Sequence, residues 1–331
     1  MVDIKAIEKH YSNPKVKEEI VKFAKNRWAA ILCSKKSSQG TLFVRYLGKF
    51  KTPLKIDKEE DLDALLKRFE KWQPRSFYAT ANLYRILRIR EDVANINNIV
   101  ACTPTWDIDN DLDDWSTTLE VVKEILNFLM ENRVEKSVFV KWSGRGCHIH
   151  IHHKAISEEL RKRFNPLDLG FAIVEYVNLK LQNRFFEISR KCSSGRLRVE
   201  NNMDPQRVFT CPLSLHKELD KVCVCIDVDK LDQFTPEWTD LKRFKHFGGW
   251  TRYVNGEADE LAVKAIDSVG PCPARPRLRR RRHKPLDKHI NEWLQKIRSD
   301  TEGGLTENIT KTRQLYLYPS NLNLREKDEF R

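Results

Sequence analysis

The chain has 331 residues, of which 40% are hydrophobic and 32% are charged, so it can bury a sizeable core under a strongly solvated surface. This balance excludes an intrinsically disordered chain, and the length fits one large unit or two closely joined modules with a tail. Lys and Arg outnumber Asp and Glu by 60 to 47, and the resulting net charge of +13 indicates a polyanionic partner such as nucleic acid or a nucleotide.

The apolar and cysteine patterns indicate a location in the cell. No apolar run reaches the roughly 18 residues that a membrane-spanning helix needs, and the charged start at Asp3, Lys5 and Glu8 is unlike a signal segment. The eight cysteines contain no C-x-x-C pair, which argues against a disulfide framework or a zinc ribbon. We therefore expect a cytoplasmic protein with no membrane partner and no zinc.

Helices and short strands are expected to alternate unevenly along the chain. In chain order, periodicity predicts a helix over 13–26, strands over 28–33 and 41–47, a helix over 58–72, strands over 76–81 and 99–109, a helix over 116–132, strands over 137–142 and 148–153, and a helix over 168–182. Several strands follow one another as hairpin-like pairs. This order predicts an α+β fold with mixed sheets rather than a strict βαβ repeat.

The composition changes sharply near the C-terminal end. Residues 268–285 contain four prolines, six arginines and one lysine but no acid, which predicts a basic linker. The domain prediction is therefore a folded domain over 1–267, the linker over 268–285, and a helix at 286–298 followed by a tail within 286–331. The basic run either contacts nucleic-acid phosphates or is a solvated linker or targeting-like segment; its central cations are Arg279, Arg280, Arg281 and Arg282.

Two acids end the predicted strand at 99–109. Asp107 and Asp109 are two residues apart, so they lie on one face of the strand, while Ile108 points to the other. Paired carboxylates suit Mg²⁺ or Mn²⁺, and two such ions can promote an in-line displacement at a phosphate. The alternative is an ordinary acidic turn. An EF-hand is excluded because Thr118 stands where its closing glutamate belongs.

A glycine-containing basic turn joins two predicted strands. Glycines let a backbone approach an anion closely, and nearby polar side chains can donate hydrogen bonds to phosphate oxygens. The turn therefore indicates a phosphate-binding segment, with an ordinary hairpin as the alternative. Its residues are Ser143, Gly144, Arg145, Gly146 and His148.

A third group of polar residues surrounds the apolar run at 208–211. Asp204 precedes Arg207 by three residues, and His216 follows in a Ser-Leu-His turn. The acid can supply another metal ligand, and the cation and imidazole can contact a triphosphate. The alternatives are a surface Asp-Pro turn leading into a core strand, and Asp227 or Asp229 as the third acid.

Taken together and in this order, the three patterns are similar to a known family. D-x-D, S-G-x-G-x-H and D-x-x-R-x-x-x-x-P-x-S-L-H resemble the catalytic small subunit of archaeal and eukaryotic DNA primase and the wider primase-polymerase superfamily. Residues 76–84 are similar to the family's Phe-Tyr-Ser-Ser-Ala segment, and residues 43–47 to its Val-Arg-x-Leu strand. The short turn resembles that of primase-polymerases from plasmids, viruses and repair systems. The resemblance spans about residues 20–225.

The resemblance implies an αβ module packed on an RRM-like catalytic module, in the cytoplasm of an archaeal-type cell. It also implies an enzyme that makes or extends primers on single-stranded DNA from nucleoside triphosphates, with Mg²⁺ or Mn²⁺ as cofactor and a primase large subunit as a further partner. The alternatives are a repair or gap-filling polymerase and a non-catalytic nucleic-acid-binding relative. By resemblance, Asp107, Asp109 and Asp204 hold the metal ions, Ser143, Gly144, Arg145, Gly146 and His148 bind the nucleotide, and Arg207 and His216 lie near its phosphates.

Overall fold

The computed structural model describes residues 4–37 and 40–273. The predicted helix at 286–298, the tail and the basic cluster at 279–282 lie outside the described residues. Helices and antiparallel sheets make up the fold, so the α+β prediction is confirmed. The sheets are not mixed, however: each ladder within the described ranges is antiparallel, because neighbouring strands are joined as hairpins or through helices that return the chain.

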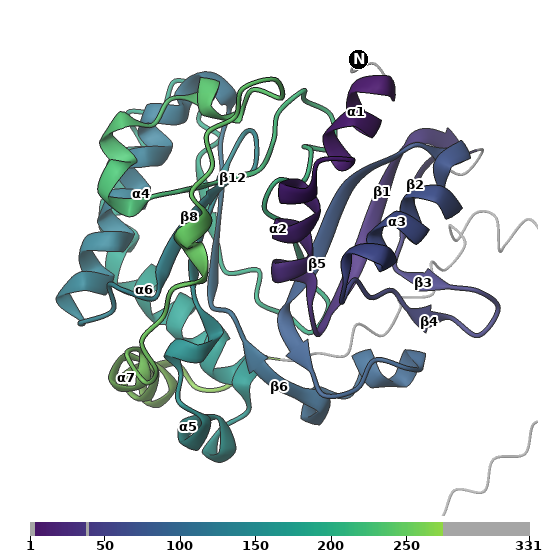
Figure 1. Ribbon diagram of the computed structural model, residues 1–331. Helices are drawn as coiled ribbons and strands as arrows, with labels where there is room; N and C mark the ends of the chain where they lie inside the picture. Colours follow the sequence, from purple (N-terminus) through teal and green to yellow (C-terminus); the bar gives the residue numbers. More distant parts are fainter. Residues whose placement is uncertain (1–3, 38–39, 274–331) are drawn as a thin grey trace, which may run out of the picture. The chain divides into compact units, whose positions relative to one another are not determined.

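One sheet, here called the N-terminal sheet, is built around the eleven-residue strand β5 (Pro74–Tyr84). This strand pairs with β1 (Arg27–Ser37) on one edge, and with β11 (Val208–Thr210) and β6 (Ile99–Cys102) along the other. Figure 1 shows α2 and α3 against these strands. The helix over 14–24 begins at an Asn13 cap followed by proline, as the sequence predicts. The strands are β1 (Arg27–Ser37), β2 (Gly40–Val44), β5 (Pro74–Tyr84), β6 (Ile99–Cys102) and β11 (Val208–Thr210), and the helices are α1 (Ile4–Tyr11), α2 (Pro14–Ala24) and α3 (Glu59–Arg68).

The second sheet has the order β10-β7-β9-β8-β12. Its chain order β7-α4-β8-β9-α6-β10 is the βαββαβ arrangement of ferredoxin-like and RRM-type modules, so we call it the RRM-type sheet. Trp106 and Ile108 are fully buried on the face that α4 and α6 cover. Its elements are β7 (Thr105–Asp109), α4 (Trp115–Glu131), β8 (Val138–Trp142), β9 (Cys147–Ile151), α6 (Pro166–Ser189), β10 (Arg198–Glu200) and β12 (Val224–Ile226).

The single strand predicted over 99–109 is two strands that belong to different sheets. β6 pairs with β5, whereas β7 pairs with β9 and β10. The break falls at Thr103 and Pro104, because proline lacks the N–H that a continuous ladder needs. This crossing places the acids of β7 in the RRM-type sheet, directly after a strand of the N-terminal sheet.

The remaining elements are short or peripheral. Ser268 and Val269, which the sequence analysis assigns to the linker, belong to the last helix of the described chain. None of the helices within 4–37 and 40–273 is long and apolar enough to cross a membrane. These elements are β3 (Tyr46–Leu47), β4 (Thr52–Pro53), α5 (Glu158–Arg163) and α7 (Asp259–Val269).

The two sheets meet around β11 and α2. The Phe209 ring of β11 lies 5.2 Å from the His148 ring and 5.9 Å from the His150 ring, measured between centroids. The buried Lys141 Nζ donates to the Thr210 carbonyl at 2.5 Å and lies 4.2 Å from the centre of the Phe23 ring of α2. Figure 1 shows α2 between β5 and β8. One face of the RRM-type sheet is thus held against the N-terminal sheet, and the candidate site lies at its edge.

Candidate active site

Asp107 is the most strongly held carboxylate of the candidate site. Its side chain is almost fully buried on β7, on the face opposite Trp106 and Ile108. Its Oδ1 accepts a hydrogen bond from His148 Nε2 at 3.2 Å, and its Oδ2 accepts from Asn202 Nδ2 at 3.0 Å. Arg207 Nη2 donates to the same Oδ2. Three donors from β9 and from the segment after β10 therefore converge on one acid.

The register of the RRM-type sheet explains this convergence. Asp107 is the cross-strand partner of His148 on one side and of Glu200 on the other. Directly opposite residues in an antiparallel pair have neighbouring side chains on the same face. Lys141 of β8 continues the row beyond His148. The row therefore places a second acid, Glu200, beside Asp107, with Asn202 Nδ2 donating to both carboxylates.

The pKa values of the two acids on β7 shift in opposite directions. Burial alone would raise the pKa of Asp107, but the hydrogen bond and charge of His148, together with Arg207 and Asn202, hold it well below its usual range. Reduced hydration, followed by the charges of Asp107 and Glu200, raises the pKa of Asp109. The repulsion felt by Asp109 means that three carboxylates crowd together here, an arrangement that a bound cation stabilises.

His148 is neutral near pH 7 because burial lowers its pKa, although the contact with Asp107 opposes that shift. Nε2 then carries the ring proton and donates a hydrogen bond to Asp107. The other ring nitrogen, Nδ1, is buried and has no hydrogen-bond partner within the described residues, and the same holds for Arg207 Nε. Unused donors and acceptors beside the acids are what a polar ligand at this point would engage.

The glycine turn packs directly against the strand that carries the acids. A Cβ at Gly146 would lie 2.2 Å from the Ile108 carbonyl oxygen, so no side chain fits there. Gly144 has a φ of +130°, and a Cβ on it would lie 2.5 Å from His216 Cδ2. Ser143 N donates to the Gly146 carbonyl at 3.0 Å and closes the turn. These glycines thus bring the turn into contact with β7 on one side and with His216 on the other.

His216 is fixed in one tautomer by its own loop. Its Nδ1 accepts hydrogen bonds from the backbone N–H groups of Glu218 at 3.1 Å and Leu219 at 2.9 Å, so the proton is on Nε2. Burial lowers the pKa of His216 to about 4, and the ring is neutral near pH 7. It therefore offers a neutral N–H donor beside Gly144, which suits a phosphate or ribose oxygen.

Arg75 holds this loop in place, and nothing in the sequence analysis singled it out. Its buried guanidinium donates from Nε to the His216 carbonyl at 2.8 Å and from Nη2 to the Leu219 carbonyl at 2.7 Å, and it lies 3.3 Å from Asp220 Oδ1. The only signal in the sequence is a charged residue near the start of an apolar strand. Arg75 is a positioning residue for His216.

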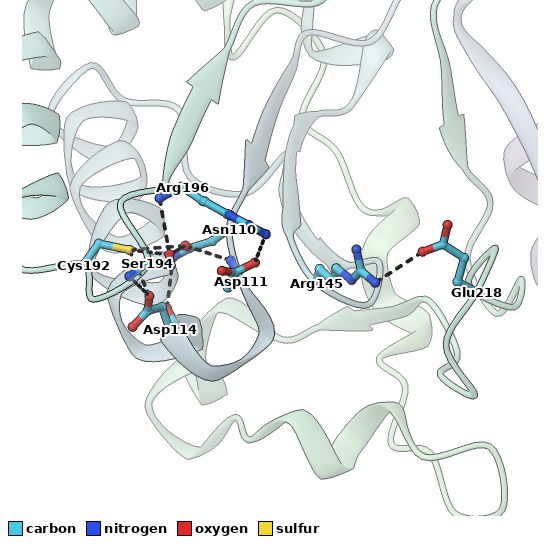
Figure 2. A network of polar contacts seen from close by, with 8 residues as sticks. All are labelled: Asn110, Asp111, Asp114, Arg145, Cys192, Ser194, Arg196 and Glu218. Carbon is cyan, nitrogen blue, oxygen red and sulfur yellow. Dashed lines mark hydrogen bonds and ion pairs between the residues drawn. The ribbon is translucent and has the colours of Figure 1, made fainter.

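Arg145, the basic residue of the turn, is paired with an acid at the surface. Its Nη2 lies 3.2 Å from Glu218 Oε2, the pair marked in Figure 2. Both side chains are more than half exposed. Exposed pairs of this kind contribute at most about 1 kcal/mol. Arg145 is consequently free to exchange this partner for a phosphate.

Asp204 has a structural role in the Asp-Pro turn, which is one of the alternatives that the sequence suggests. Its Oδ1 accepts the backbone N–H of Gln206 at 2.5 Å and that of Arg207 at 2.6 Å, which makes it the cap of the turn that aims Arg207 at Asp107. Asp227 and Asp229 lie after β12, at the edge of the sheet opposite β10. Glu200 is the acid that stands directly opposite Asp107.

A polar network holds the loop before β10 against the segment after β7 (Figure 2). Ser194 N donates to Asp114 Oδ2 at 2.9 Å, and Arg196 Nη1 lies 3.3 Å from Asp111 Oδ1. Hydrogen bonds from Cys192 and Ser194 lower the pKa of Asp114 to about 2. The acids that follow Asp109 therefore fix the position of β10, and with it Glu200, relative to β7.

The residues present fit a divalent cation held jointly with a substrate. Within 4–37 and 40–273, no group of three or more His, Cys, Asp or Glu side chains is placed to hold a metal ion by itself. Mg²⁺ does not need one, because it is commonly bound through one or two carboxylates together with substrate phosphates and water. Asp107 and Asp109 share one face of β7, and burial, followed by the charge of Asp107, raises the pKa of Asp109.

Comparisons with known proteins add a structural likeness. No protein-family model and no curated protein matches the chain. Among solved structures, the polymerase domain of Mycobacterium tuberculosis ligase D in complex with DNA is similar, with a TM-score of 0.47 and 15% identity over 80% of this chain and 88% of that chain. At this level of similarity the function has to be argued from the site itself.

Proposed function

We propose that the protein is a DNA-directed nucleotidyltransferase of the primase-polymerase type, which makes or extends primers on a single-stranded template. The observation that carries this proposal is the convergence of three motifs that are far apart in the sequence. Gly146 packs on the backbone between Asp107 and Asp109, Arg207 bonds to Asp107, and His216 lies against Gly144. An ordinary acidic turn, hairpin and Asp-Pro turn would have no reason to meet at one point.

The roles follow from the position of each side chain. Asp107 and Asp109 would hold Mg²⁺ or Mn²⁺, which when bound supplies Lewis-acid activation of a 3′-hydroxyl and neutralisation of charge on the departing pyrophosphate. His148 orients Asp107 through its Nε2–H. Ser143, Arg145 and His216 line the turn where the triphosphate would be held in line. Arg207, which bonds to Asp107, would be a cation within reach of the phosphates.

The position of Glu200 supports a different third acid from the one that the sequence suggests. Glu200 is the cross-strand partner of Asp107 and raises the pKa of Asp109, whereas the Asp204 carboxylate is engaged by two backbone N–H groups. We therefore favour Glu200 as the further carboxylate of the site and regard Asp204 as the residue that positions Arg207.

The test is nucleotide incorporation by two charge-removing variants. Asp107→Asn and Asp109→Asn keep the size of each side chain but remove the metal-binding charge, so incorporation on a primed template should fall by a factor on the order of 10³ while single-stranded DNA binding is retained. Asp113→Asn is the matched control, because this exposed acid lies in the same acidic run and has no partner among the site residues. Incorporation that is undiminished in both variants would rule out the metal-dependent mechanism.

The finer assignment depends on the starting substrate. Synthesis of a labelled product without any primer, on a single-stranded template with each nucleotide set, would mark a primase that resembles the DNA primase small subunit. Product only from a primed or gapped template would favour a repair or gap-filling polymerase. Adding a primase large subunit to the same reaction tests whether that partner is required.

A further inference from the structure

The open face of the N-terminal sheet carries an aromatic pair that the proposed mechanism does not use. Phe43 of β2 is 41% exposed. Its ring meets the Tyr78 ring of β5 edge to face, with centroids 5.9 Å apart. In β1, which lies between the two strands, Leu32 is the cross-strand partner of Phe43 and Ala30 is that of Tyr78. The neighbouring Phe77 and Val44 face the opposite way and are buried. The alternation places these two rings together on the side away from the helices.

A cation continues the same face, stacked on the buried ring of Trp28. Arg45 lies two residues after Phe43, and its guanidinium carbon is 3.4 Å from the centre of the Trp28 ring. It donates to the Gln206 carbonyl at 2.9 Å and bonds to no carboxylate in the part of the chain that the structure describes. Single exposed apolar residues are common on protein surfaces. This surface is a more specific signal for a ligand, because it combines the flat apolar rings of Tyr78 and Phe43 with the positive charge of Arg45.

This surface adjoins the candidate active site. Tyr78 pairs with Thr210, and Arg207 lies only three residues before Thr210, or about 10 Å along an extended chain. On its other side, Tyr78 lies near Glu218, the partner of Arg145 in the glycine turn: burial raises the pKa of the Tyr78 hydroxyl to about 12, and the Glu218 charge adds to this shift. A strand that leaves the turn can therefore reach the rings within a few nucleotides.

We propose that Phe43 and Tyr78 form a stacking surface for a base of single-stranded nucleic acid that is bound at the active site. Every base has an aromatic face, and base stacking on a protein ring is tolerant of sequence, as a template-binding surface requires. Arg45 and the exposed Lys217 supply the positive charge that matches the phosphates. The inference deepens the proposed function, since it assigns a contact for the template or primer strand of that reaction.

The test is the affinity for a fluorescently labelled oligothymidylate at a fixed salt concentration of about 0.1 M. Phe43→Ala should weaken binding by about 5-fold to 150-fold, since base stacking contributes roughly 1–3 kcal/mol. Phe43→Trp should keep the affinity within about 2-fold, and Phe43→Leu, which retains an apolar side chain without a π-face, should behave like Phe43→Ala. Tyr253→Ala is the matched control, because Tyr253 is 42% exposed, like Phe43, and lies outside the N-terminal sheet.

A second measurement separates stacking from a change in folding. An oligonucleotide that carries 2-aminopurine should be quenched on binding to the unmodified protein and to Phe43→Trp, but less by Phe43→Ala, with equal thermal midpoints for all variants. Equal affinity and equal quenching in Phe43→Ala, or full affinity in Phe43→Leu, would overturn the proposal.

The outcome is independent of catalysis. The Asp107→Asn variant, which should be inactive, is expected to retain binding that depends on Phe43. If the unmodified protein incorporates nucleotides but Phe43→Ala binds normally, only the stacking inference fails. If it incorporates none while Phe43→Ala still binds poorly, the surface stands and the polymerase proposal fails.

Discussion

At the residue scale, two acids compete for one role. Glu200 and Asp204 both lie in the segment after α6. Glu200 accepts a hydrogen bond from Asn202 Nδ2, and Asp204 accepts one from the backbone N–H of Arg207. Only Glu200 faces Asp107 across a strand pair. Asp204 instead accepts two backbone N–H groups, and a neutral amide oxygen can accept the same two bonds. Replacing each acid by its amide therefore removes the charge while an oxygen that can accept hydrogen bonds is kept.

We predict that Glu200→Gln and Asp204→Asn have different effects on nucleotide incorporation. Glu200→Gln removes a carboxylate from the acid cluster and should lower incorporation by about 100-fold or more. Asp204→Asn preserves the turn through its amide oxygen and should stay within about 5-fold of the unmodified protein. Steady-state rates at saturating Mn²⁺ measure both effects. The reverse order of the two effects would make Asp204 the third metal-binding acid.

At the element scale, α2 joins parts of the chain that are more than 200 residues apart. Glu19 of this helix is almost fully buried, and its Oε2 accepts hydrogen bonds from His246 Nε2 at 2.9 Å and from Trp250 Nε1. Lys22 Nζ lies 3.1 Å from its Oε1. Burial alone would raise the pKa of Glu19, but these partners lower it from 4.5 to about 2. The ionised form is thus favoured by folding.

We predict that Glu19→Gln destabilises the protein by about 2–3 kcal/mol at pH 7. Because the pKa of Glu19 is lower in the folded state, its contribution is complete above pH 4.5 and is lost as the pH falls towards 2. The difference between variant and unmodified protein in urea denaturation should therefore shrink across that interval. Glu18→Gln, at an exposed neighbour that pairs with the same lysine, is the control and should change stability by less than about 0.5 kcal/mol. A pH-independent difference for Glu19→Gln would contradict the prediction.

Local patterns predicted much of the fold, and the limits of the prediction have a physical cause. The helix over 14–24 and the strands around the glycine turn depend on caps and periodicity that are close in the sequence, so they could be recognised. The break at Pro104 could have been expected too, because a proline within a predicted strand interrupts its hydrogen-bond ladder. The pairing of Glu200 with Asp107 and the clamp from Arg75 to His216 depend on strand register and on contacts across more than 90 residues, which no local pattern contains.

At the scale of the whole molecule, the described fold ends next to its own candidate site. Cys272 N donates to Asp168 Oδ1 at 3.0 Å, and Cys272 Sγ lies 3.6 Å from the carbonyl of Met203, the residue before Asp204. The strongly basic part of the sequence begins immediately afterwards. Its charge contributes a large share of the net +13 and suits contacts with phosphates that are independent of sequence.

We predict that replacing Arg279, Arg280, Arg281 and Arg282 with glutamine lowers the salt dependence of single-stranded DNA binding. Each phosphate contact contributes about 0.7 to the slope of log K against log salt, so the slope should fall by up to about 3. The control replaces four surface lysines that are already paired with acids, namely Lys123, Lys162, Lys191 and Lys264. An equal slope in the arginine variant and the unmodified protein would show that these four arginines do not contact the DNA phosphates.

The contact between Gly146 and the Ile108 carbonyl restricts how this site can diversify. Because even a methyl group at position 146 would collide with the main chain of β7, the turn cannot be reshaped there without moving the acids as well. Arg145, in contrast, projects to the surface and is limited only by an exposed ion pair. Natural or engineered changes in nucleotide preference are therefore expected to accumulate at position 145 and in the Glu218 loop, while position 146 stays glycine.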